Sequence, residues 1–168
     1  MKLSEYYNII RNKVMIKKVQ GKVYLSDISL ISMNCIGGTF YHDMNCKFLT
    51  PTVNLFFTAS DFIKFVNDLD YYLSFTPVVE MGEKYPIGTL DDIKIFFMHY
   101  DSCEDALQKW EDRKKRVNPQ KIFVIMVEQN GFSKEDFENF KKIKYPKILF
   151  VNNKVYECED SVYFSQYE

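Results

Sequence analysis

The chain has 168 residues, of which 46% are hydrophobic. That length suits one domain with a buried core, and that hydrophobic share excludes a disordered chain. A formal net charge of −1 gives no basic field for nonspecific nucleic-acid binding. The apolar runs are too short to cross a bilayer. We therefore expect a single domain over residues 1–168, with no membrane span.

Residues 1–7 and the cysteines indicate the cellular compartment in which the protein is expected. Residues 1–7 lack the apolar stretch of a signal peptide, which predicts a cytoplasmic location. The four cysteines form no C-x-x-C pair, and the chain has two histidines. We therefore expect reduced thiols and no metal site. The sequence indicates no particular cofactor and no oligomeric state.

The first third of the chain has one ambiguous segment and one clear strand. Residues 4–17 are compatible with a helix that begins at Ser4, or residues 14–25 form a hairpin around Gln20-Gly21. Residues 28–33 are an apolar run typical of a buried strand. The residues that follow, 34–38, have the pattern of a strand-to-helix turn.

Three later helices have clear starts, after Thr58, Ser102 and Ser133, because each residue is a good N-cap before an amphipathic segment. Phe57 and Phe62 flank the first of these caps at the spacing of a hydrophobic staple. The helix after Ser102 has acidic residues in its first turn and basic residues in its last turns, which suits the helix dipole.

Strands are predicted between these helices, over residues 77–81, 93–99, 122–127 and 147–151. The order of elements predicts a layered α/β fold with a mixed, partly parallel sheet flanked by helices. We expect residues 28–33 and 93–99 to share that sheet. Ligands in such folds bind beyond the carboxyl ends of parallel strands, so the residues after those ends are the candidates for a site.

The first candidate is the turn that contains Asn34 and Cys35. Gly37 and Gly38 allow the backbone to turn sharply and to approach a ligand closely. A helix beginning here would offer N–H groups to an anion and would favour ionisation of the Cys35 thiol. The alternative is a tight turn with a buried, inert cysteine. The turn matches neither a Walker loop nor a dinucleotide fingerprint.

The second candidate is His99, which follows a predicted strand. It is placed to act as a general base, or to pair with Cys35 if the two strands adjoin. The alternative is a hydrogen-bonded histidine in the core or at its rim. On the next helix, Trp110 and Arg113 share a face and are suited to clamp a phosphate or carboxylate. A solvated helix end explains the same pattern.

Two further loops carry polar groups. Thr50 and Thr52 lie in a loop fixed by Pro51, where their hydroxyls are suited to bind a sugar or an anion. An ordinary turn explains them equally well. Glu128 is the acidic candidate at the end of the strand over residues 122–127.

Several of these segments, taken in order, resemble one bacterial family. The segments are residues 31–38, 50–56, 61–65, 85–88 and 90–95, followed by His99-Tyr100, Lys109-Trp110, Arg113 and residues 116–118. They resemble the bacterial domain of unknown function numbered nineteen-nineteen, whose members often carry the name exopolysaccharide biosynthesis protein. The resemblance covers about residues 29–128, and it implies a setting in surface-glycan or capsule loci.

The resemblance and the candidate residues lead to three hypotheses. The leading one is a cytoplasmic enzyme of exopolysaccharide or capsule biosynthesis, with a transferase acting on a glycan or its activated precursor as the suggested activity. The alternative is a non-catalytic module that binds a sugar, a nucleotide-sugar or a biosynthetic partner, and a third is a structural interaction domain. The catalytic candidates are Cys35 and His99, and the ligand-binding candidates are Asn34, Gly37, Gly38, Thr50, Thr52, Tyr100 and Arg113.

Overall fold

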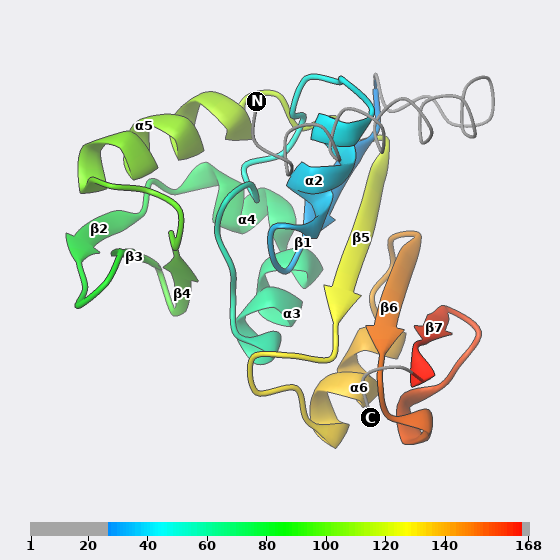
Figure 1. The fold of residues 1–168 in the computed structure, drawn as a ribbon. Coiled ribbons are helices and arrows are strands. Elements are labelled where there is room, and N and C mark those ends of the chain that lie inside the picture. The colour runs from blue at the N-terminus through cyan, green and yellow to red at the C-terminus, as the bar shows by residue number, and fades with distance from the viewer. Residues whose placement is uncertain (1–26, 166–168) are drawn as a thin grey trace, which may run out of the picture.

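The structure is a computed structural model that describes residues 27–165 (Figure 1). The predictions of a helix over residues 4–17 and of a hairpin around Gln20-Gly21 lie outside the described residues. Element labels follow Figure 1. None of the helices in the described range has the length and the apolar character needed to cross a membrane.

Four parallel strands form the larger sheet. They are β1 (Ser29–Ser32), β5 (Ile122–Val127), β6 (Lys147–Val151) and β7 (Ser161–Tyr163), in the order β1-β5-β6-β7. Strands buried on both faces read as continuous apolar runs, and this is why the sequence predicted the first three. β7 was not predicted, since a strand of three residues carries no periodic signal.

Three antiparallel strands form a second sheet, in the order β2-β3-β4. They are β2 (Val78–Met81), β3 (Pro86–Leu90) and β4 (Ile93–Phe96). β3 was not predicted as a strand, because its proline and glycine are both unfavourable in strands. The strand predicted over residues 93–99 ends at Phe96, three residues early.

The α/β class, with parallel and antiparallel strands flanked by helices, is confirmed, but the prediction that residues 28–33 and 93–99 share one sheet is wrong. Residues 53–57, here called the seam, run between β1 and β4. The Phe57 N–H donates to the Met33 carbonyl at 3.0 Å, and Phe56 and Phe96 exchange backbone hydrogen bonds of 2.9 Å. The seam therefore lies between the two strands that were expected to share one sheet.

The helix starts predicted after Thr58, Ser102 and Ser133 are confirmed. The helices are α2 (Ile36–Asp43), α3 (Ala59–Asn67), α4 (Leu69–Ser74), α5 (Cys103–Lys114) and α6 (Lys134–Lys141). The side chains of Thr58, Ser102 and Ser133 each accept a hydrogen bond from the backbone N–H three residues on, which satisfies a donor that the helix leaves free. The rings of Phe57 and Phe62 lie 5.8 Å apart, as a hydrophobic staple requires.

The helices cover the parallel sheet unequally (Figure 1). α3 and α6 contribute to the main core on one face, together with Ile31, Val124 and Leu149 of the sheet. α2 packs against the other face near β1, where a smaller core includes Leu30 and Ile125. On this second face, a pocket lies beside α2 at the ends of β5 and β6.

Candidate functional site

The turn after β1 is held by its own side chains. The Asn34 side-chain oxygen accepts from the Ile36 N–H at 3.1 Å, and the Ser32 hydroxyl accepts from the Gly37 N–H at 3.1 Å. Two N–H groups of the first turn of α2 are thus already satisfied. These two donors are therefore not available to the anion that was predicted to bind at this turn.

The two glycines of this turn allow close packing. A Cβ atom added at Gly37 would lie 2.9 Å from the Ser32 hydroxyl oxygen, and one at Gly38 would lie 3.2 Å from a methyl carbon of Val53. Both glycines are buried. In this structure they bring α2 close to β1 and to the seam, which is a packing role.

Cys35 precedes α2 and is half-buried. Its thiol donates to the Leu55 carbonyl across 3.8 Å. Burial raises the pKa of the thiol above its ordinary value of 9.0, and hydrogen bonds to backbone groups only partly oppose that shift. The thiol is therefore neutral at physiological pH, which is unfavourable for a nucleophile.

His99 lies just after β4 and is exposed. Its backbone N–H donates to the Asn54 carbonyl at 3.3 Å. Among residues 27–165, no hydrogen bond joins its side chain to Cys35. Because the seam separates the ends of β1 and β4, the backbones of those two ends are about two strand spacings, roughly 10 Å, apart. The two catalytic candidates contact one backbone segment without forming a pair.

Tyr100 and Arg113 contact the same segment. The Tyr100 hydroxyl donates to the Val53 carbonyl at 2.8 Å, and Arg113 Nη1 donates to the Tyr100 hydroxyl oxygen at 2.6 Å. Burial raises the pKa of Tyr100, and the charge of Arg113 opposes that effect. Three consecutive seam carbonyls, at residues 53, 54 and 55, thus accept from Tyr100, His99 and Cys35 respectively. We call Cys35, His99, Tyr100 and Arg113 the seam cluster.

Two other predicted groups have structural roles in this structure. Thr50 and Thr52 are fully buried, and their hydroxyl oxygens lie 2.9 Å apart. Thr52 also accepts from the Ser32 N–H at 3.0 Å. Their hydroxyls fasten the seam to β1 and have no surface to offer a ligand, so the turn interpretation fits the structure better.

Trp110 does not join Arg113 in a clamp. It is 1% exposed and packs against Phe65 and Phe97, with ring centroids 6.0 and 6.3 Å away. A side chain in the core cannot contact a ligand, so Trp110 does not take part in the predicted phosphate or carboxylate clamp.

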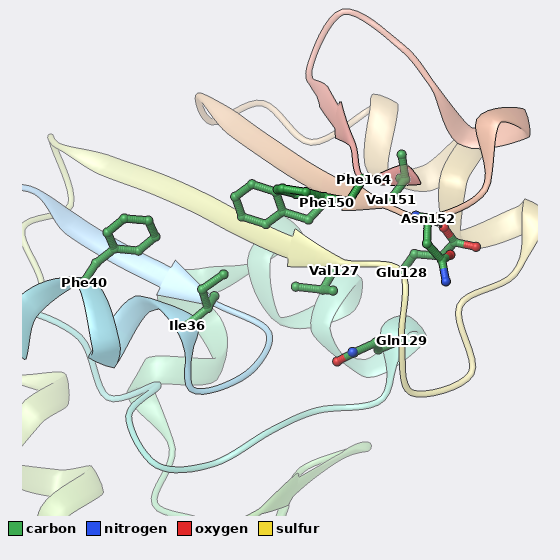
Figure 2. A pocket seen from close by; sticks show the side chains of 9 residues that line it. All are labelled: Ile36, Phe40, Val127, Glu128, Gln129, Phe150, Val151, Asn152 and Phe164. Atoms are coloured by element: carbon green, nitrogen blue, oxygen red, sulfur yellow. Dashed lines mark hydrogen bonds between the residues drawn. The ribbon is translucent and has the colours of Figure 1, made fainter. Parts of the chain in front are cut away.

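A cavity of about 890 Å³ lies at the carboxyl ends of β5 and β6, on the face of the sheet that α2 partly covers (Figure 2). We call it the sheet-end pocket. Phe40 projects from α2 on one side, and Phe150 and Phe164 lie on the other. The pocket is lined by Ile36, Phe40, Val127, Glu128, Gln129, Phe150, Val151, Asn152 and Phe164.

The polar side chains gather at one end of this pocket (Figure 2). The Glu128 carboxylate accepts from the backbone N–H groups of Asn152 and Asn153, at 2.8 and 2.9 Å. The Gln129 side-chain oxygen accepts from the Asn34 amide at 3.5 Å. The carboxylate thus ties the end of β5 to the end of β6, and amide groups stand beside it.

The sequence pointed to only part of this pocket. Glu128 was a candidate because it ends a predicted strand, and Asn152 follows another predicted strand in the same way. The aromatic walls were missed, since a phenylalanine that lines a pocket has the same sequence pattern as one in a core. Only the three-dimensional placement of Phe40 and Phe164 distinguishes the two.

The fold and the pocket define an α/β domain with a pocket at the carboxyl ends of parallel strands, where this class binds ligands. The chain matches the family model of a domain of unknown function, DUF1919, over residues 6–168. It is 31% identical over 150 residues to an uncharacterised protein of Haemophilus influenzae (strain Rd). The alignment covers 88% of this chain and 72% of that protein. The chain belongs to the DUF1919 family.

The family match is longer than the motif resemblance over residues 29–128. It includes β6, β7 and the second wall of the sheet-end pocket. The description of the family assigns no reaction, and neither does the name of the relative.

Proposed function

We propose that this protein is a cytoplasmic sugar-binding module of exopolysaccharide or capsule biosynthesis. In this proposal the sheet-end pocket holds a sugar ring of a glycan or of its activated precursor. The observation that carries the proposal is the make-up of the pocket, with aromatic rings on two sides and polar groups at one end (Figure 2). A sugar ring has an apolar C–H face and a hydroxyl edge, which these two features complement.

The charge and size of the pocket also support a neutral group. Lysine, arginine and histidine are absent from its nine lining residues, so nothing in the lining favours a phosphate. The volume of about 890 Å³ falls within the usual range for small-molecule sites, about 300–1,000 Å³. The surface-glycan setting implied by the sequence motifs is consistent with a sugar as the ligand.

The transferase hypothesis has less support. It assigns a nucleophile to Cys35 and a base to His99, and these would have to act on the same bond. Burial favours the neutral thiol of Cys35, and no hydrogen bond joins the two side chains within the described residues. A binding role requires neither an ionised thiol nor an acid-base pair.

The experiment is a titration of the ¹⁵N-labelled full chain with neutral hexoses and N-acetylhexosamines, followed by NMR. We expect saturable shifts of the Gln129 and Asn152 amides. Phe164→Ala should weaken sugar binding several-fold, because it removes one of the two aromatic rings on that side of the pocket. Phe75→Ala is the matched control, since Phe75 is a similarly exposed aromatic residue that does not line the pocket.

Two results would reject the proposal. One is the absence of saturable shifts with every neutral sugar tested, under conditions in which the protein is folded. The other is equal binding by Phe164→Ala and Phe75→Ala, which would place the sugar somewhere other than the sheet-end pocket.

A further inference from the structure

Arg113 has an unusual environment for a half-buried cation. It lies in the last turn of α5, with its guanidinium carbon 5.4 Å from the centroid of the Phe48 ring. Its Nη1 atom donates to the Tyr100 hydroxyl at 2.6 Å and, at 3.5 Å, to the Val53 carbonyl. These contacts fix the plane of the guanidinium group beside the seam.

Much of the guanidinium group has no hydrogen-bond partner among residues 27–165. An arginine has five N–H donors, and both hydrogen bonds described above start at Nη1. Over residues 27–165, no hydrogen bond starts at Nη2 or Nε of Arg113, and no carboxylate lies within ion-pair distance of it. Within the described part of the chain, one edge of the planar fork is therefore left without a protein acceptor.

Two lysines of the same intermediate burial make a useful contrast. The side chain of Lys114 is 13% exposed and pairs with Glu111 at 2.7 Å, and that of Lys147 is 11% exposed and pairs with Asp160 at 3.3 Å. A cation removed from water usually has such a partner, because desolvation is unfavourable without one. The dipole of α5 compensates Arg113 only in part.

We propose that Arg113 and Tyr100 form a binding site for a small oxyanion, a phosphate or carboxylate group, with Cys35 and His99 at its edge. The planar fork of arginine matches both groups, because it can donate two parallel hydrogen bonds. The Tyr100 hydroxyl positions the fork, since its own proton is donated to the Val53 carbonyl. This site goes beyond the proposed sugar site, as none of its four residues lines the sheet-end pocket.

The backbone of the seam explains how the four residues come together. Its carbonyls at residues 53, 54 and 55 accept from Tyr100, His99 and Cys35, and the backbone bends at this point, where Asn54 has a φ of 63°. Tyr100 and Arg113 bind the first of these carbonyls. An anion on the open edge of Arg113 would therefore lie near a neutral thiol and an exposed histidine, and no described carboxylate pairs with the arginine to repel it.

The test is a titration of the full chain with inorganic phosphate and, separately, with acetate, at constant ionic strength. We expect saturable shifts of the Arg113 side-chain N–H signal and of the Cys35 amide. Arg113→Gln should abolish them, and Arg113→Lys should weaken binding several-fold because an ammonium group lacks the planar fork. Lys115→Gln is the matched control, since it removes an exposed charge from the same helix end.

Saturation by phosphate, by acetate or by both supports the site. The ion that binds with the higher affinity identifies the class of ligand. Saturation by neither ion would overturn the proposal, as would equal binding by Arg113→Gln and the wild type. An equal loss in Lys115→Gln would also overturn it, because it would indicate a diffuse charge effect. Sugar binding by Arg113→Gln should be unchanged, so failure here is distinguishable from failure of the sugar site.

Discussion

The two sides of the first turn of α2 differ in chemistry. Ile36 lines the sheet-end pocket, whose walls are aromatic and whose lining has no basic residue. The preceding residue, Cys35, instead binds the seam, where Arg113 provides a cation. Adjacent residues of a helix do not face the same way, so one turn can border two environments. The difference indicates that a neutral group suits one side and an anion the other.

Breaking the attachment of α2 should have the largest effect, because α2 borders both sides. The Tyr41 hydroxyl accepts from the Leu30 N–H at 3.0 Å and donates to the Ile28 carbonyl at 2.5 Å. Tyr41→Phe leaves both groups without this partner and should lower the free energy of unfolding by about 2–3 kcal/mol. Denaturant unfolding measures this loss.

The control for that variant is Tyr71→Phe, which removes an exposed hydroxyl bonded to Asp91. Its effect should stay within about 0.5 kcal/mol. Equal stabilities of the two variants would contradict the role given to Tyr41.

A smaller loss of stability is expected for a substitution that affects the seam side alone. Thr52→Val removes the acceptor of the buried Ser32 N–H, which should cost about 1–2 kcal/mol in the free energy of unfolding. Because Val53 follows directly, phosphate binding should weaken while sugar binding is unchanged. Thr89→Val, at an exposed position of β3, should change neither stability nor binding. A loss of sugar binding in Thr52→Val would show that the two sides are not separate.

Asn34 contacts both sides of this turn, through Gln129 and Ile36, and its removal should slightly destabilise the structure on both sides. Asn34→Ala removes the acceptor for the Ile36 N–H and the donor to Gln129, at an expected cost of about 1 kcal/mol in the free energy of unfolding. Asn34→Asp keeps the acceptor and should recover most of that stability. Thermal unfolding of the two variants checks this, and equal losses would contradict the role given to the Asn34 side-chain oxygen as acceptor for the Ile36 N–H.

The smallest expected effect is on the reactivity of Cys35. Because burial raises the pKa of its thiol above 9.0, the thiolate is scarce at pH 7 and alkylation by iodoacetamide should be slow. The rate should rise with pH and reach half of its maximum only above pH 9.0. Peptide mass mapping of the four cysteines measures this. Fast labelling of Cys35 at pH 7 would instead support the catalytic role predicted from the sequence.

The sequence predicted most elements of the fold from local signals. The caps at Thr58, Ser102 and Ser133 are short patterns with a direct physical cause, so the helix starts were predictable. The arrangement of the sheets was not, because the seam carries a single bridge at Phe56 and has no strand pattern. It lies between β1 and β4, which were expected to share one sheet and belong to two.

For the candidate site too, the sequence predicted the residues but not the contacts between them. Cys35, His99, Tyr100 and Arg113 were singled out from their positions after strands and on a helix, and the structure brings all four to the seam. Their contacts run through backbone carbonyls, which no residue pattern reveals. The aromatic walls of the pocket come from segments more than a hundred residues apart, which sequence periodicity does not connect.

One NMR titration of the wild-type chain with a neutral hexose, recorded with and without saturating phosphate, tests most directly whether the two sites are separate. We expect the same shifts of the Gln129 and Asn152 amides and the same affinity in both conditions, because in our proposals the sugar binds in the sheet-end pocket and the anion at Arg113. Loss of the hexose shifts when phosphate is present, or hexose shifts confined to the seam cluster, would contradict this expectation.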